Sequence, residues 1–227
     1  MPRTQAALHP LGARVAPAAL FLLLSVTVLA VGAWAVCPEG HCAATDFDRF
    51  SLGLAHALRS APLDRVMGGA TWLGSLLVLL PLAVLASGFL HVGGRRREAG
   101  FVMLALLSTS ALCHVVKLWV ARARPDLFPA WLPMPDDWSY PRAHTMQATA
   151  VAVALVLLAG RRQGAWIMTL GMAVLLVGLS RIYLQVHFPS DVLAGFLAAA
   201  FWAGGLYHLM LGRPSRPTNE RPKGGMT

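Results

Sequence analysis

Charge is scarce in this sequence, and its scarcity excludes most soluble folds. Charged residues make up 13% of the chain, whereas hydrophobic residues make up 56% and form long uncharged runs. Such runs indicate an integral membrane protein. The alternation of apolar and polar residues that a transmembrane barrel requires is also missing. Because only helices and closed barrels satisfy backbone polar groups in lipid, we predict an all-α polytopic membrane protein.

Six apolar segments predict six transmembrane helices. A span needs about 20 mostly apolar residues, and five segments approach or reach that length. The remaining segment, Thr145–Ala159, becomes long enough only if Tyr140 to His144 forms its first turn. The other five segments are Ala18–Val36, Thr71–Leu90, Phe101–Val120, Ala165–Leu184 and Val192–Leu211.

The first segment has an alternative interpretation as a cleaved signal peptide. Arg3 and Arg14 precede its apolar core, and small residues lie near Ala33 and Ala35. The run is long for a signal core, and its removal would leave five helices with the termini on opposite sides. Retention as a spanning helix is therefore favoured.

Positive charge predicts the orientation in the membrane. The net charge of +9 could indicate a nucleic-acid partner, but a large group of cations falls on one side of a six-helix layout. The positive-inside rule makes that side cytoplasmic, so both termini are predicted to be cytoplasmic and no nucleic-acid partner is expected. These cations are Arg3, Arg14, Arg95, Arg96, Arg97, Arg161, Arg162, Arg213, Arg216, Arg221 and Lys223.

Composition divides the chain into three parts. Residues 1–17 are predicted to be a cytoplasmic tail and residues 18–211 the six-helix domain. Residues 212–227 are polar and rich in Pro and Gly, and are predicted to be a disordered cytoplasmic tail.

The segment 46–65 follows the first span and has apolar residues at helical spacing, with its charges on the other face. It is expected to be a connector along the membrane surface that covers the helix ends.

The sequence has few clusters of residues that could bind a metal ion. Cys37 and Cys42 could form a disulfide if the outer compartment is oxidising. A metal site with His41 between them is disfavoured, because two thiols and one imidazole are too few ligands. Asp136 and Asp137 have no further carboxylate or His cluster beside them in the sequence. We therefore predict no metal and no cofactor.

Ionisable residues gather where predicted spans meet the outer face. Lys117 and Arg124 stand seven residues apart, two helical turns along one face, if Pro125 stops the third helix. His144 lies at the start of the fourth helix. The fifth helix ends at Ser180 and Arg181, and His187 and Asp191 open the sixth. Because ionisable groups at membrane depth are costly, their convergence on one face indicates a functional site.

These residue types suit phosphoryl transfer. The transition state carries charge on equatorial oxygens, which Lys117, Arg124 and Arg181 could neutralise. His187 would attack phosphorus as a neutral imidazole, while Asp191 orients its other nitrogen. His144 would protonate the leaving oxygen and then activate water.

The segment 117–191 resembles the type 2 phosphatidic acid phosphatase superfamily, which is related to the vanadium haloperoxidases. The superfamily's first signature, Lys-x6-Arg-Pro, is matched at Lys117, Arg124 and Pro125. Its third, Ser-Arg-x5-His-x3-Asp, is matched over Ser180–Asp191. The resemblance implies a helical, metal-independent phosphatase with an outward-facing site, in a bacterial inner or plasma membrane.

The second signature, Pro-Ser-Gly-His, is altered. Arg142 replaces Ser, and Ala143 replaces Gly before His144. Ala143 is harmless if that position is helical and costly if it needs a positive φ, and the helix start favours the former. Arg142 is expected to add a fourth cation, facing a second phosphate or a bulky headgroup.

The leading hypothesis is a membrane lipid phosphatase with a phosphohistidine intermediate. Phosphatidic acid, phosphatidylglycerol phosphate, undecaprenyl pyrophosphate and lipid A phosphates are candidate substrates. A lipid phosphotransferase using the same intermediate is the alternative, and a non-catalytic phospholipid-binding relative is a third. Lipid specificity and the oligomeric state stay open.

Overall fold

The computed structural model describes residues 9–131 and 136–212, and this part of the chain is all-α. It contains eight α-helices and three short 3₁₀ turns. The helices are α1 (His9–Val36), α2 (Asp46–Ala57), α3 (Ala61–Ala70), α4 (Leu76–Val92), α5 (Arg96–Val120), α6 (Ala143–Leu158), α7 (Gln163–Tyr183) and α8 (Pro189–Leu211). The turns are η1 (Pro38–Gly40), η2 (Thr71–Gly74) and η3 (Gly160–Arg162).

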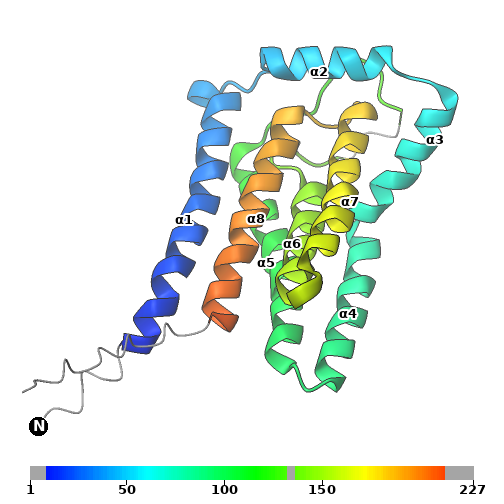
Figure 1. The fold of residues 1–227 in the computed structure, drawn as a ribbon. Coiled ribbons are helices and arrows are strands. Elements are labelled where there is room, and N and C mark those ends of the chain that lie inside the picture. The colour runs from blue at the N-terminus through cyan, green and yellow to red at the C-terminus, as the bar shows by residue number, and fades with distance from the viewer. Residues whose placement is uncertain (1–8, 132–135, 213–227) are drawn as a thin grey trace, which may run out of the picture.

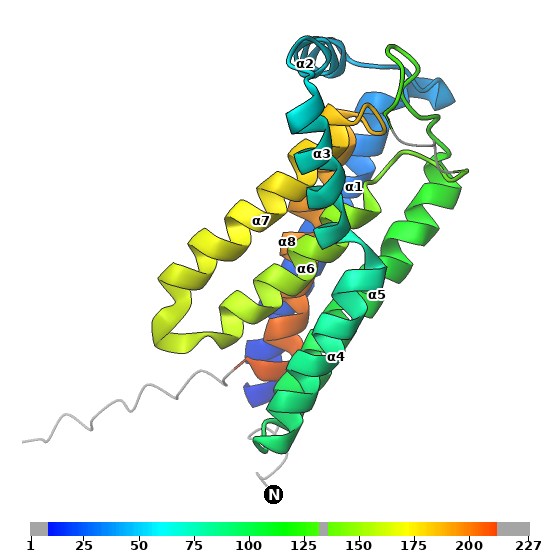
Figure 2. The ribbon, with the colours of Figure 1, turned by 90° about the vertical axis from the view of Figure 1, so that its right-hand side faces the viewer.

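Helices α1 and α4 to α8 form a bundle, and α2 lies across one end of it (Figure 1). Helix α1 packs along α8, while α6 occupies the interior (Figure 2). The connections from α4 to α5 and from α6 to α7 lie toward the end opposite α2. This arrangement brings the C-terminal end of α5 and the N-terminal ends of α6 and α8 together beneath α2.

Length and composition give four helices that could cross a membrane, or five if a bent pair counts as one span. The four are Arg14–Val36, Arg96–Val120, Gly160–Tyr183 and Pro189–Leu211, and the bent pair joins Ala61–Gly74 to Leu76–Val92 at 48°. Helix α6 has only 16 residues, and most of its first three turns are buried by protein. The chain is thus a multi-pass membrane protein, and a sixth full span stays a prediction.

The predicted start of the fourth helix was wrong. Helix α6 begins at Ala143, with Arg142 in an extended conformation before it, so Tyr140 is not helical. The Tyr140–Pro141 peptide bond is cis. The Tyr140 side chain is buried, and its hydroxyl donates a hydrogen bond to the Leu29 carbonyl at 2.8 Å. This segment therefore ties the helix start to α1 instead of extending α6.

The predicted end of the third helix was also wrong. Helix α5 ends at Val120, because Ala121 adopts the left-handed conformation (φ 49°, ψ 37°) and its N–H bonds the Lys117 carbonyl. Such a residue closes a helix, so Pro125 is not what stops it. Arg124 thus lies in the following loop and not two turns along the helix from Lys117. The turn at Ala121 directs Arg122 into the protein, where it is buried.

The loop after α1 carries a disulfide between Cys37 and Cys42. The helix α2 that follows begins with a capping box, in which Thr45 and Asp48 bond each other's backbone N–H groups at 3.1 Å. Asp48 is fully buried, so the expectation that the charges of this segment lie on the face away from the protein was wrong at this residue.

Small residues on α8 allow α1 to approach closely. A Cβ added at Gly205 would lie 2.7 Å from Leu22 Cγ and 3.2 Å from the Ala18 carbonyl oxygen. Beside this contact, the Ser25 hydroxyl donates to the Ala198 carbonyl at 2.8 Å. The small residues on α8 therefore allow its close contact with α1.

We expect Gly205→Ala to destabilise the fold. The added methyl group would force α1 and α8 apart, at a cost of about 1–3 kcal/mol in the free energy of unfolding. The control is Gly88→Ala in α4, where no atom lies within 4 Å of the added Cβ. Thermal unfolding of both variants in one detergent checks this, and equal melting temperatures would contradict the packing argument.

Candidate active site

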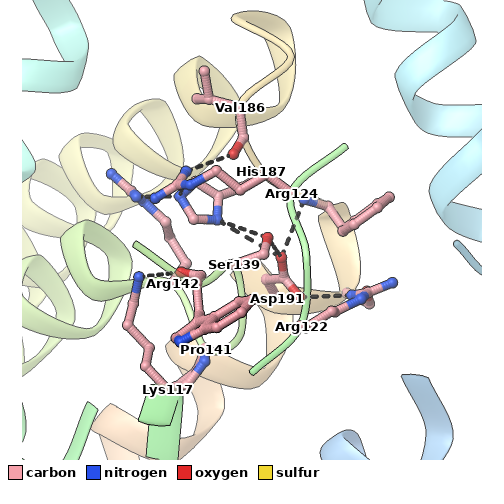
Figure 3. Close-up of polar contacts among 12 residues, drawn as sticks. Lys117, Arg122, Arg124, Ser139, Pro141, Arg142, Val186, His187 and Asp191 are labelled. Atoms are coloured by element: carbon pink, nitrogen blue, oxygen red, sulfur yellow. Dashed lines mark hydrogen bonds and ion pairs between the residues drawn. The ribbon is translucent and has the colours of Figure 1, made fainter. Parts of the chain in front are cut away.

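The candidate site lies beneath α2, where four parts of the chain converge (Figure 3). Lys117 comes from the last turn of α5, and Arg124 from the loop after it. Arg142 precedes α6, and His187 and Asp191 come from the turn and first helical residues that open α8. The structure therefore brings together residues that are up to 74 positions apart in the sequence.

His187 is at the centre of the cluster and is completely buried. Its Nε2 contacts Nη1 of Arg124 at 2.7 Å and also Nη1 of Arg142. Its Nδ1 lies 3.2 Å from the Ser139 hydroxyl and 3.7 Å from Oδ2 of Asp191. The two ring nitrogens thus face opposite environments, guanidinium groups on one side and a hydroxyl with a carboxylate on the other.

Burial lowers the pKa of His187 well below its ordinary value, and the neighbouring cations lower it further. Both effects disfavour a charged ring, so the imidazole is neutral at physiological pH. A neutral ring keeps a lone pair on one nitrogen, as a nucleophile requires. In order of effect, the cations are Arg142, Arg124, Arg181 and Lys117.

Asp191 is held from three directions and is completely buried. Its Oδ2 accepts hydrogen bonds from the Phe188 N–H at 3.2 Å and from the Ser139 hydroxyl. Its Oδ1 accepts a 2.6 Å hydrogen bond from Nη1 of Arg122. Pro189 in the first turn of α8 fixes the helix start that supplies this geometry.

Asp137 bridges the two cations of the first signature. Its carboxylate forms ion pairs with Lys117 and Arg124, although Arg124 is not on the helix. Partial burial acts to raise the pKa of Asp137, but the hydrogen bonds and charges of Lys117 and Arg124 outweigh it and lower that pKa. Arg124 also donates to the Val186 carbonyl at 2.8 Å. Asp137 therefore aligns two cations.

Arg142 and Arg181 keep unpaired donors. Arg142 is 2% exposed, and its Nε and Nη2 have no hydrogen-bond partner in residues 9–131 and 136–212. Arg181 donates to the Thr71 hydroxyl at 2.6 Å, while its Nε has no partner within the same ranges. Buried donors are rarely left unpaired, so a concentration of them beside a neutral His indicates a place for an anion. Arg142 is thus no surface residue.

His144 lies in the first turn of α6, close to η2. A Cβ added at Gly74 would meet the His144 Cβ at 2.9 Å. His144 is half-buried. Ala143 is helical and has no positive φ, so an alanine at the family's glycine position carries no backbone strain.

Five residues of this site were missed by sequence reasoning, and Asp137, which pairs with Lys117 and Arg124, is one of them. Asp48 bonds Arg122 at 2.9 Å, and Ser190 bonds both of them. Ser139 lies between His187 and Asp191 (Figure 3). One local signal existed for Asp48, since it lies four residues before Leu52 and so shares that residue's buried face.

Comparison with known proteins agrees with this geometry. A model of the PAP2 superfamily matches residues 98–214. The chain belongs to the PAP2 superfamily. Phosphatidylglycerophosphatase B of Bacillus subtilis (strain 168) is 37% identical over 150 residues, which cover 61% of this chain and 71% of the relative. Undecaprenyl-diphosphatase of Sulfolobus acidocaldarius is 32% identical over 147 residues, which cover 62% and 68%.

A solved structure supports the fold as well. The crystal structure of a transmembrane PAP2 type phosphatidylglycerolphosphate phosphatase from Bacillus subtilis aligns with a TM-score of 0.65 and 28% identity. The alignment covers 86% of this chain and 94% of that one. The protein is therefore a multi-pass membrane lipid phosphatase of the PAP2 superfamily.

Proposed function

We propose that the protein hydrolyses the phosphate or pyrophosphate headgroup of a membrane lipid through a phosphohistidine on His187. The observation that carries this proposal is the environment of His187, with Nε2 toward Arg124 and Arg142 and Nδ1 toward Asp191. A headgroup phosphate placed between Nε2 and the guanidinium groups would meet both the nucleophile and the charges that stabilise its transition state.

The proposed reaction has two steps. The lone pair of His187 Nε2 forms a bond to phosphorus as the bond from phosphorus to the leaving oxygen breaks, and His144 supplies a proton to that oxygen. Water, deprotonated by His144, then attacks phosphorus and releases phosphate from His187. Asp191 stabilises the cationic ring of the intermediate. Lys117, Arg124 and Arg181 neutralise the oxygens of the transferred group, and Arg142 faces the second phosphate of a headgroup that carries one.

An apolar groove beside the site supports a lipid substrate. The groove has a volume of about 580 Å³ and lies between α2, α3, α7 and α8. Thr145 and Pro189 line it; Thr145 directly follows His144, and Pro189 lies two residues after His187. An apolar tail in the groove would leave the headgroup near the cations. Water-soluble phosphate esters would lack this contact and are expected to be poor substrates.

Charge favours a headgroup with two phosphates. Four cations surround the site, and the Asp137 carboxylate pairs with two of them, Lys117 and Arg124. The unpaired donors of Arg142 add capacity beyond the three cations of the family signatures. One relative is named for phosphatidylglycerophosphate and another for undecaprenyl diphosphate, so the two names cover both a lipid phosphomonoester and a lipid pyrophosphate. We therefore rank lipid pyrophosphates above phosphomonoesters for this chain.

Arginine placement supports an outward-facing site. Arg95 precedes α5, Arg96 and Arg97 begin it, and Arg161 and Arg162 lie in η3, all toward the end opposite α2 (Figure 1). By the positive-inside rule that end is cytoplasmic, together with the start of α1 and the end of α8, so the site faces the periplasm or exterior.

Phosphate release by the detergent-purified protein tests the proposed function. The panel contains undecaprenyl pyrophosphate, phosphatidylglycerol phosphate, phosphatidic acid and lipid A, each with and without excess chelator. Release above a protein-free control, unchanged by the chelator, is the expected result. Lipid products that carry a transferred phosphoryl group would favour phosphotransfer, and no turnover of any lipid would overturn the proposal.

We expect Arg142→Ser, which restores the family's residue, to change substrate preference. It should lower kcat/KM for undecaprenyl pyrophosphate about 10- to 100-fold, because one charge-assisted contact is lost. The loss for phosphatidic acid should be under about threefold. Equal losses on both lipids would contradict a role for Arg142 at the second phosphate.

A further inference from the structure

A buried chain of polar contacts connects α2 with the nucleophile. It runs from Asp48 through Arg122 to Asp191 and His187. Nη2 of Arg122 donates to Oδ2 of Asp48 at 2.9 Å, and Nη1 donates to Oδ1 of Asp191 at 2.6 Å. Arg122 is 1% exposed, and neither carboxylate is exposed at all. Figure 3 shows Arg122 against Asp191, on the side away from Lys117 and Arg142.

The guanidinium of Arg122 is fixed on several sides. Nη1 also donates to the Ser190 hydroxyl at 2.8 Å, and Nη2 to the Ala43 carbonyl at 2.7 Å. The group lies over the Phe188 ring, 3.9 Å from its centroid. Asp48 is held in turn by the Ser190 N–H at 2.9 Å. Neither Asp48 nor Arg122 contacts the Nε2 side of His187, so neither lies where substrate would bind.

The charges of this chain do not cancel. Two carboxylates, Asp48 and Asp191, flank the single guanidinium of Arg122, which leaves one negative charge in excess within a buried cluster. An isolated pair of Arg122 and Asp191 would be neutral. An excess negative charge in this buried group stabilises a positive charge that forms on the adjacent His187 ring.

The reaction supplies that positive charge. When His187 Nε2 bonds to phosphorus, the ring keeps its Nδ1 proton and becomes cationic. Asp191 Oδ2 lies 3.7 Å from that nitrogen. We propose that Asp48 and Arg122 are positioning residues, which fix the orientation of Asp191 and keep its negative charge available to the phosphohistidine. This inference rests on the proposed function.

Without the charge of Asp48, the positive charge of Arg122 would be matched by Asp191 alone. The group of Asp48, Arg122 and Asp191 would then be neutral, and it would no longer offset the positive charge that forms on the His187 ring. Formation of the intermediate would slow, while substrate binding on the Nε2 side would change little. The expected signature is therefore a loss in kcat with KM preserved.

Asp48→Asn, assayed in the full-length protein on its best lipid, tests the proposal. We expect kcat to fall about tenfold, KM to change less than about twofold, and acid-quenched phosphohistidine to form correspondingly more slowly. Asp64→Asn is the matched control, because the Asp64 carboxylate also ties two helices, through Tyr183 at 2.8 Å and Arg59 at 3.5 Å, without contacting Asp191. It should keep kcat within about twofold.

A double-mutant cycle separates positioning from simple stabilisation of the fold. In an Asp191→Asn background, Asp48→Asn should cost less than about threefold further, because residues that act through one another do not add. If the double variant loses kcat by the product of the two single-variant factors, the proposal is overturned. If Asp48→Asn does not fold, Ser190→Ala takes its place in the same cycle, with a loss of about threefold expected. An inactive wild type would refute the proposed function. An active wild type in which the two losses in kcat multiply would refute only this inference.

Discussion

Replacing His187 by Ala is expected to lower phosphate release by about 10⁴-fold or more, because the variant has no atom that can accept the phosphoryl group. His187 is completely buried, and its Nε2 faces the guanidinium groups of Arg124 and Arg142. The loss should be the same on every lipid that the wild type hydrolyses.

Two measurements make this result specific. Acid quenching during turnover should trap a phosphorylated protein with the wild type and none with His187→Ala. His114→Ala, which removes an exposed histidine from α5, should keep full activity and an unchanged melting temperature. Residual release above 1% of wild type by a folded His187→Ala protein would show that another group attacks phosphorus.

Asp191→Asn is expected to lower kcat by about a thousandfold. An amide at this position can neither select the tautomer that leaves Nε2 free nor stabilise the cationic ring of the intermediate. The substitution preserves volume, and Arg122 keeps Asp48 as its partner at 2.9 Å, so the fold should persist. KM should change by less than about threefold, since Asp191 lies on the Nδ1 side of His187, away from the phosphate.

The decisive comparison is the rate of phosphohistidine formation in a single turnover. Asp191→Asn should slow this step by the same factor as kcat. A variant that formed phosphohistidine at the wild-type rate but released phosphate slowly would contradict the assigned role, because Asp191 would then act on water and not on the nucleophile.

Sequence reasoning placed the apolar helices correctly but misjudged the last residue of α5 and the first residue of α6. Hydropathy depends on each residue's own transfer free energy, which is why all six apolar segments correspond to helices in the structure. The C-terminal end of α5 and the N-terminal end of α6 depend instead on contacts with residues that are distant in the sequence. Arg122 leaves the helical path to reach two buried carboxylates, and Tyr140 leaves it to reach the Leu29 carbonyl. Neither partner is near in sequence.

The same distinction holds in the candidate site. Lys117, Arg124, His187 and Asp191 were found from fixed spacing, and the structure places them together although Arg124 is in a loop. Their roles stay predictions until the variants are measured. Asp48 was assigned to the solvent face, because an Asp within an amphipathic segment is ordinarily exposed.

The sequence by itself determined the membrane location, the helical class and which residues are candidates for phosphoryl transfer, since each follows from local composition or from spacing along one chain. Only the tertiary structure decided that Arg142 is buried against His187 and that Arg122 bonds both Asp48 and Asp191. The reason is physical: a buried charge is tolerated only where a partner meets it, and these partners come from segments far apart in the sequence.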